Sequence, residues 1–151
     1  MIALASDHAG FPLKQVIQGY LDELGIAWKD FGTYSEERSD YPEFGYKAAM
    51  AVKNGECEKG IVICGTGFGI SLSANKVKGI RCVLCSEPYT ALLSRQHNDS
   101  NMLAMGGRVV GSDLAKMIVK IWLEGEFEGG RHANRVEMVT AIENENFEKS
   151  D

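Results

Sequence analysis

The apolar residues of this chain fall into short runs that alternate with longer amphipathic stretches. A short apolar run at residues 2–5 predicts a strand, and Pro12, a residue that favours the first helical turn, opens a helix. Apolar residues then recur at helical spacing on one face, at Leu13, Val16, Ile17, Tyr20, Leu21 and Leu24. Gly25 ends this pattern, so the segment predicts one amphipathic helix.

The alternation continues along the chain. Further strands are predicted at residues 26–31, 60–64, 80–84 and 102–105, and helices at residues 43–53, 69–77 and 88–96. The run from Gly60 to Cys64 is almost wholly apolar, which is typical of a central strand buried on both faces. A fifth helix follows, and its predicted apolar face consists of Leu114, Met117, Ile118, Ile121 and Trp122.

Strands and helices that alternate in this order favour right-handed crossovers and a parallel sheet. We therefore expect a doubly wound, Rossmann-like α/β fold with a five-stranded parallel sheet and helices on both faces, in a single domain over residues 1–151. Such sheets bind ligands beyond the carboxyl ends of their strands. The segments that follow the predicted strands are residues 7–8, 33–41, 64–69, 87 and 106–108.

The last predicted helix has no strand after it. Its start carries Arg131 and Arg135, which are four positions apart and hence share one face, with His132 between them. Two guanidinium groups on one face suit a phosphate, although a solvated helix start has the same pattern. The apolar positions that follow are Val136, Val139, Ile142 and Phe147. They would cover either the same domain or a second copy of the chain, and the pattern leaves both open.

Composition narrows the classes of protein to consider. The chain has 151 residues, 44% apolar and 25% charged, as is usual for a globular domain. Its formal charge of -5 disfavours binding to nucleic acid or a membrane surface, because both use a broad basic face. The apolar start is too short for a signal peptide, and no stretch approaches the roughly 20 apolar residues of a membrane span, so we expect a cytoplasmic protein. In that reducing compartment the four cysteines are expected to be thiols.

Cys64 ends the most apolar strand and precedes a loop rich in glycine. Gly65, Gly67 and Gly69 leave room for backbone N–H groups to converge on an anion beside the start of a helix. A helix N-terminus favours the thiolate form of cysteine, so Cys64 is a candidate base or nucleophile beside an oxyanion hole. A buried structural cysteine before a turn explains the same residues equally well.

Spacing tests the motifs that this loop partly matches. A cysteine phosphatase needs an arginine six positions after the cysteine, where this chain has Ile70, and no P-loop Gly-Lys-Ser/Thr follows. A dinucleotide-binding fingerprint follows the first strand of its fold, whereas this loop follows the third strand. Glu87 stands where a ribose-binding acid would be, so a dinucleotide site stays open as an alternative. Cys82 and Cys85 would point to opposite faces of a strand, which disfavours a zinc or redox pair.

Two polar segments are further candidates. Asp7 and His8 directly follow the first strand, where ligand contact or a helix cap would explain them. His97 and Asn98 lie in a polar run before the last strand. That run is either a solvated connection or the place of an acid that works near neutral pH.

The motifs as a set cover almost the whole chain. They are Ser6-Asp7-His8-Ala9-Gly10, Asp40-Tyr41-Pro42, Cys64-Gly65-Thr66-Gly67, Asn75-Lys76, Ser94-Arg95-Gln96-His97-Asn98-Asp99 and Gly130-Arg131-His132 to Arg135. Together they resemble the ribose-5-phosphate isomerase type B family, whose fold the galactose-6-phosphate isomerase subunits share. Ser71 lies where some members place a catalytic glutamate, so the base is not divided here, and Phe68 is bulkier than the aliphatic residue expected.

The resemblance implies an aldose–ketose isomerase of the pentose phosphate pathway. It would interconvert ribose 5-phosphate and ribulose 5-phosphate through an enediolate, without metal or cofactor. His97, helped by Asp7, would open the sugar ring, and Cys64 would carry the proton between C2 and C1. The implied binding residues are Thr66 and the amides of Gly65, Gly67 and Gly69 for the oxyanion, Tyr41 and Asn98 for the sugar hydroxyls, and His8, Arg108, Arg131 and Arg135 for the phosphate.

The resemblance also implies a homodimer with shared active sites, and it leaves a tetramer open. The last helix would then pack on the partner subunit, and some phosphate-binding residues would come from that partner. Galactose-type enzymes divide the base and the ring-opening acid between two different chains, whereas this chain carries both, which favours ribose. A six-carbon allose or galactose 6-phosphate isomerase and a non-catalytic sugar-phosphate or nucleotide-binding module remain alternatives.

Overall fold

A computed structural model describes residues 1–147, which form five strands and six helices. The elements are β1 (Ile2–Ser6), α1 (Phe11–Glu23), β2 (Trp28–Asp30), α2 (Tyr41–Lys53), β3 (Lys59–Cys64), α3 (Phe68–Ala74), β4 (Cys82–Leu84), α4 (Pro88–Asn98), β5 (Met102–Gly106), α5 (Ser112–Glu124) and α6 (Arg131–Asn146). The end of the predicted domain, residues 148–151, lies outside the described residues.

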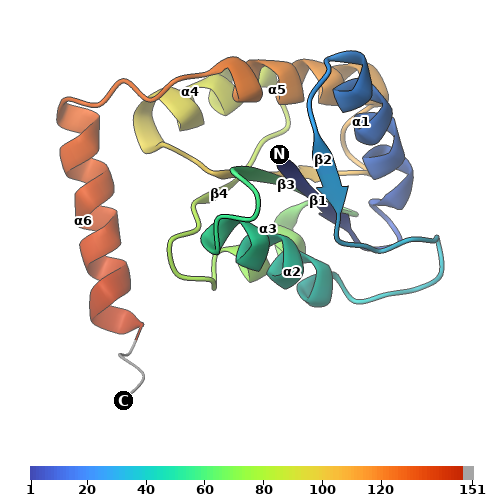
Figure 1. Cartoon of the computed structure of the whole chain (residues 1–151), viewed down its shortest axis with the longest axis horizontal. Helices are drawn as coiled ribbons and strands as arrows, with labels where there is room; N and C mark the ends of the chain where they lie inside the picture. Colours follow the sequence, from blue (N-terminus) through green and yellow to red (C-terminus); the bar gives the residue numbers. More distant parts are fainter. Residues whose placement is uncertain (148–151) are drawn as a thin grey trace.

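The five strands form one parallel sheet in the order β2-β1-β3-β5-β4. β3 lies in the middle, and Val62 is in register with Ala5 of β1 and Ala104 of β5. Figure 1 shows α1, α4 and α5 on one face of the sheet and α2 and α3 on the other. The doubly wound, five-stranded fold expected from the sequence is therefore confirmed.

Each face of the sheet has its own apolar core. On the first face, Leu13, Ile17 and Leu21 of α1 are buried, as their helical spacing predicts. On the second face the core is built around small residues of α2 such as Ala48 and Ala49. Because these side chains are small, α2 packs close to the sheet. This close packing fixes the positions of the strands whose ends carry the predicted site.

The predicted apolar face of α5 is wrong at two positions. Leu114 is 37% exposed and Met117 is 59% exposed. The residues that pack on the sheet are Ala115, Ile118, Val119 and Trp122. These four follow the spacing i, i+3, i+4 and i+7, so the buried stripe is centred on small Ala115 rather than on the larger apolar residues beside it.

Some element boundaries also differ from the prediction. α2 begins at Tyr41, two residues early, because Pro42 lies in its first turn and Asp40 occupies the N-cap. All four cysteines are free thiols, as predicted. Cys82 packs in the core on one face of the sheet and Cys85 in the core on the other, so the prediction that they point apart is confirmed.

α6 lies apart from the three layers (Figure 1). No side chain of α6, from Arg131 to Asn146, is buried. Met138, Val139 and Ile142 are each more than half exposed. Three exposed apolar side chains on one helix form a surface suited to another protein surface. Among residues 1–147, no helix has the length and apolar character needed to cross a membrane.

Candidate active site

The loops after β1, β3 and β5 meet at the carboxyl edge of the sheet. Asp7 N donates to Ile63 O at 3.2 Å, Gly107 N donates to Cys64 O at 2.8 Å, and Arg108 N donates to Gly65 O at 3.0 Å. Chain connections leave β1 and β3 in opposite directions, which makes the space between their ends the usual ligand site of a doubly wound sheet. The sequence predicted residues from all three loops, and the structure brings them together.

Cys64 is the last residue of β3 and is buried. Its Sγ accepts a hydrogen bond from Gly67 N at 3.2 Å. Gly67 has φ 85°, and a Cβ on it would lie 2.4 Å from Leu84 Cδ1. Only glycine therefore fits this turn, which directs a backbone donor at the sulfur. The turn therefore holds the Cys64 sulfur in a fixed position beside a backbone donor.

The loop after Cys64 is flanked by a guanidinium and a phenol ring. A Cβ on Gly65 would lie 3.4 Å from Arg108 Nη1, and a Cβ on Gly69 would lie 2.4 Å from Tyr41 Cζ. The Tyr41 ring thus lies directly on the Gly69 backbone, in space that a side chain at position 69 would fill, and Arg108 lies within contact distance of Gly65. A cation and a hydroxyl group beside a thiol can bind an anionic, hydroxylated ligand.

The loop after β1 is held by hydrogen bonds from two directions. Asp7 is buried, and its Oδ1 accepts from Gly10 N at 2.9 Å. His8 N donates to Ser39 Oγ at 3.1 Å, and Ser39 N donates to His8 Nδ1 at 3.2 Å. Nδ1 also lies 3.2 Å from Ser39 O, so the ring accepts from Ser39 N in one tautomer and donates to Ser39 O in the other. The sequence pointed to residues 33–41 as a segment but did not single out Ser39.

A buried ion pair ties this segment to α1. Lys14 Nζ lies 2.7 Å from Asp30 Oδ1 and also donates to the backbone oxygen of Thr33. Gln18 Nε2 donates to the other oxygen of Asp30 at 2.9 Å. Burial lowers the pKa of Lys14, and Asp30 offsets part of that effect. The pair fixes the start of the segment that leads to Ser39.

The remaining predicted residues lie elsewhere, near the amino edge of the sheet. His97 and Asn98 form the last turn of α4, just before β5 begins. The His97 ring stacks on His132 of α6 with ring centroids 4.2 Å apart. His97 Nε2 is 3.5 Å from Glu128 Oε1. Desolvation, with His97 as the next cause, lowers the pKa of His132. Arg131 lies in the same first turn of α6, and Arg135 follows one turn later.

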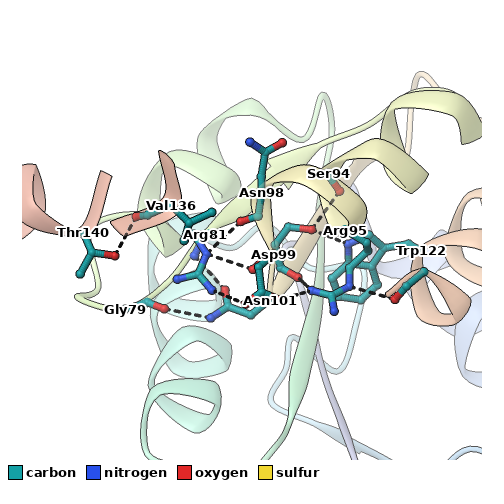
Figure 2. A network of polar contacts seen from close by, with 12 residues as sticks. Gly79, Arg81, Ser94, Arg95, Asn98, Asp99, Asn101, Trp122, Val136 and Thr140 are labelled. Atoms are coloured by element: carbon teal, nitrogen blue, oxygen red, sulfur yellow. Dashed lines mark hydrogen bonds and ion pairs between the residues drawn. The ribbon is translucent and has the colours of Figure 1, made fainter. Parts of the chain in front are cut away.

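A polar network fixes the turn that carries His97 and Asn98 (Figure 2). Arg81 Nε donates to Asn98 O at 3.2 Å and to Asp99 O at 2.9 Å. Asp99 has φ 48°, and its carboxylate lies between Arg81 and Arg95, which donates to it at 3.0 Å. Arg81 could not be predicted as a supporting residue, because nothing in its local sequence pattern links it to position 99.

The predicted site residues therefore form two groups in one chain. The carboxyl-edge group is Asp7, His8, Tyr41, Cys64, Gly65, Thr66, Gly67, Gly69 and Arg108, and the amino-edge group is His97, Asn98, Arg131 and Arg135. The length of β3, roughly 17 Å for its six residues, separates the two edges. One small ligand cannot touch both groups within a single chain.

A groove of about 460 Å³ lies next to the amino-edge group, between α6 and the edge of the sheet at β4. Its lining is Asn75, Ile80, Arg81, Cys82, Val83, Asn98, Arg135, Val136, Val139, Ile142, Glu143 and Phe147. Most of these side chains are apolar, whereas Asn98 and Arg135 belong to the predicted site. The groove is thus continuous with the second group of site residues.

The dinucleotide interpretation depended on Glu87. Its carboxylate accepts hydrogen bonds from Thr90 N at 3.1 Å and caps the start of α4. The Thr90 hydroxyl and N–H lower the pKa of this carboxyl group. Glu87 therefore has a complete structural role as a helix cap.

Known proteins resemble this chain along nearly its whole length. A family model described as Ribose/Galactose Isomerase matches residues 2–139. Ribose-5-phosphate isomerase B of Escherichia coli (strain K12) is 59% identical over 142 residues, which cover 94% of this chain and 95% of that protein. The solved structure of Clostridium thermocellum ribose-5-phosphate isomerase B is 56% identical, with a TM-score of 0.94 over 95% of this chain and 97% of that one.

A third similar protein was solved with a ligand. Ribose-5-phosphate isomerase B from Mycoplasma genitalium, with bound ribulose-5-phosphate, is 39% identical and has a TM-score of 0.90 over 96% of this chain and 97% of that chain. Sequence and backbone thus agree across nearly the full length of each protein. The chain belongs to the ribose/galactose isomerase family.

Proposed function

We propose that this chain interconverts ribose 5-phosphate and ribulose 5-phosphate as a cytoplasmic aldose–ketose isomerase. The observation that carries the proposal is the Cys64 thiol, which receives the Gly67 N–H and lies in a glycine loop between Arg108 and Tyr41. The identity of 59% with the Escherichia coli ribose-5-phosphate isomerase B supports ribose 5-phosphate as the substrate. The ribulose-5-phosphate in the Mycoplasma genitalium relative supports the product.

The reaction would begin with the opening of the furanose ring. His97, as an imidazolium, donates a proton to the ring oxygen while Asp7 accepts the proton of the C1 hydroxyl group. The bond between C1 and the ring oxygen breaks, and C1 becomes an aldehyde. Because one proton enters and one leaves, the sugar keeps its formula.

Isomerisation of the open sugar would then use Cys64. Its thiolate removes the proton from C2, and the electron pair moves to the C1 oxygen, which becomes the oxyanion of an enediolate. The amides of Gly65 and Gly69, with Thr66, hold that oxyanion, while Gly67 N keeps its hydrogen bond to Cys64 Sγ. The thiol returns the proton to C1, the C2 hydroxyl proton passes to the C1 oxygen, and a ketone remains at C2.

A shared site between two chains would join the two groups of residues. The roughly 17 Å between the edges of the sheet prevents His97 and Cys64 of one chain from acting on the same sugar. We infer that the amino-edge group of a partner chain faces the carboxyl-edge group. The exposed apolar positions of α6, Val139 and Ile142 among them, support an interface between copies of this chain.

The phosphate would bind at the junction of the two groups. Arg108 and His8 come from the chain that supplies Cys64, and Arg131 and Arg135 come from the partner, while Tyr41 and Asn98 bind the sugar hydroxyls. Guanidinium groups bind phosphate oxygens in a fixed, two-pronged geometry. Anchoring the phosphate fixes the distance of C1 and C2 from it, so the length of the sugar chain determines which carbons reach Cys64.

The proposal is tested by an isomerase assay with Cys64→Ala and a matched control. Purified protein is expected to convert ribose 5-phosphate to ribulose 5-phosphate with chelator present. Loss of the base should lower kcat by at least about 100-fold. Cys57→Ala removes another buried thiol and should keep the wild-type rate. An inactive wild-type protein, or a near-normal rate for Cys64→Ala, would contradict the proposal.

A further inference from the structure

Three metal-ligating side chains gather outside the carboxyl-edge group. They are His97 at the end of α4, Glu128 in the loop between α5 and α6, and His132 in the first turn of α6. Their ligand atoms all lie within 4.8 Å of one another, and His97 Nε2 is 3.5 Å from Glu128 Oε1. Two imidazoles and one carboxylate are the ligand set of many zinc sites that keep a fourth position open.

The backbone brings the three side chains together. Glu128 N donates to Gln96 O at 3.0 Å, which fixes the loop beside the last turn of α4. Gly129 has φ 68° and Gly130 has φ 56°, so the chain reverses there and α6 starts with its first turn over α4. His132 N donates to Gly129 O at 3.0 Å, and its ring then stacks on His97. Two consecutive glycines in the left-handed region thus place His132.

We propose that His97, Glu128 and His132 bind one divalent transition-metal ion such as Zn²⁺, and that this ion inhibits the enzyme by occupying His97. The inhibitory part rests on the proposed function, in which His97 donates the proton that opens the ring. A nitrogen that coordinates a metal ion has no lone pair or proton for acid catalysis. The metal is therefore an inhibitor of the reaction, and a chelator reverses its effect.

Metal binding needs a small movement of the side chains. Tetrahedral zinc with bonds of about 2.1 Å holds its ligand atoms about 3.4 Å apart. The ligand atoms here lie within 4.8 Å of one another, so no separation must shrink by more than about 1.4 Å. The two rings are within 8° of parallel, and one of them must turn before both nitrogen lone pairs meet the same ion. Partial exposure of His97 and Glu128, 37% and 50%, leaves room for these rotations.

The charges and the ligand atoms of the cluster together determine which metal ions it binds. Arg131 and Arg135, on the same helix as His132, repel a cation, and Glu128 attracts one. Hard ions such as Mg²⁺ prefer oxygen ligands and bind imidazole poorly, whereas zinc binds imidazole well. We therefore expect inhibition by Zn²⁺ and none by Mg²⁺ at equal concentration.

The direct test titrates Zn²⁺ into the full-length, chelator-treated protein and follows its histidine ring signals by NMR. The chain has three histidines, His8, His97 and His132, so their ring signals can be assigned with single replacements. We expect the His97 and His132 signals to shift, with one ion bound per chain. Zinc binding that leaves both signals unchanged, or binding that Cys64→Ser abolishes, would overturn the proposal.

Matched variants separate the metal site from general charge effects. Glu128→Gln removes the carboxylate ligand and should weaken Zn²⁺ binding by at least about tenfold. Glu126→Gln removes the same charge two residues earlier, from an exposed side chain, and should leave zinc affinity unchanged. Equal zinc affinity of Glu128→Gln and the wild type would overturn the site.

The inhibitory role has its own readout. Wild-type isomerase activity should fall at least about tenfold when the NMR site is filled, and chelator should restore it. Undiminished activity with the site filled would overturn the inhibitory role. A wild-type protein that binds zinc but has no isomerase activity in chelator would contradict the proposed function instead, so the two failures are distinguishable.

Discussion

Replacement of Lys14 by methionine tests whether a buried ion pair supports the site. Lys14 is 0% exposed, and its ammonium contacts Asp30 and the backbone oxygen of Thr33. Methionine has a similar length but neither charge nor donors. Lys14→Met therefore leaves the Asp30 carboxylate without its cation. It also removes the contact with Thr33, at the start of the segment whose Ser39 is hydrogen-bonded to His8.

The structure sets the expected magnitude. Removal of one partner from a buried ion pair costs about 3–5 kcal/mol of unfolding free energy. Asp30 keeps two donors, Gln18 Nε2 at 2.9 Å and Gly32 N at 2.8 Å, and its side chain is 19% exposed. We therefore expect a loss at the lower end, about 3 kcal/mol. Lys14→Met combined with Asp30→Asn has no unpaired charge and should recover part of that loss.

Urea unfolding at a fixed chain concentration measures the effect, because association of chains would add a concentration dependence. Lys120→Met changes an exposed lysine of α5 and should alter the unfolding free energy by no more than about 0.5 kcal/mol. A loss below about 1 kcal/mol for Lys14→Met would refute the structural role given to the pair.

The pH dependence gives a second readout for Lys14. Burial lowers its folded-state pKa below the ordinary value of 10.5. Between the folded-state pKa and 10.5, the unfolded chain binds more protons at this site than the folded chain does. The Lys14 contribution to the unfolding free energy therefore rises with pH in that window. The difference in unfolding free energy between wild type and Lys14→Met should grow across the same window, and a constant difference would contradict the assignment.

The remaining predictions concern the carboxyl-edge group, with Gly19 of α1 as a matched control position. Gly69→Ala places a methyl group against the ring of Tyr41, a predicted sugar-binding residue, so KM for ribose 5-phosphate should rise. Because the ring is 41% exposed and can move, the unfolding free energy should change by less than about 1 kcal/mol. Gly19→Ala has open space around its new methyl group and should stabilise α1 by about 0.5–1 kcal/mol with unchanged kinetics. Burial raises the pKa of the thiols of Cys57, Cys82 and Cys85, which slows their reaction with iodoacetamide at neutral pH. Iodoacetamide should therefore modify Cys64 first, and ribose 5-phosphate should slow that modification. Mass spectrometry measures the order of labelling, and faster modification of Cys82 would contradict it.

Much of the fold was predictable because its signals are local. Most strands are short apolar runs, β2 being the exception, and helices such as α1 have apolar residues at helical spacing, so the order of elements and the parallel sheet followed from the sequence. The face of α5 was not predictable from the same rule. Two overlapping stripes are apolar there, and contact with the sheet, rather than hydrophobicity alone, selects Ala115 over Met117.

The carboxyl-edge group was predictable as a set because parallel strands end at one edge. The structural role of Lys14 was not predictable, because a lysine among apolar residues gives no indication that Asp30 will be its partner in a buried ion pair. The separate position of His97 was predictable in principle. It precedes β5 instead of following a strand, and in a parallel sheet that places it at the amino edge. The role predicted for His97 rested on the family motif, which carries no information about the edge of the sheet at which the residue lies.

We propose that one active site takes Cys64 from one chain and His97 from another. Mixing Cys64→Ala protein with His97→Gln protein, after reversible dissociation, tests it most directly. Each variant alone is expected to be inactive. In a random mixture of dimers half are mixed, and each mixed dimer holds one site with both residues intact, so about 25% of wild-type activity should return. A mixture that forms mixed dimers, shown by native mass spectrometry, yet stays inactive would contradict the shared site.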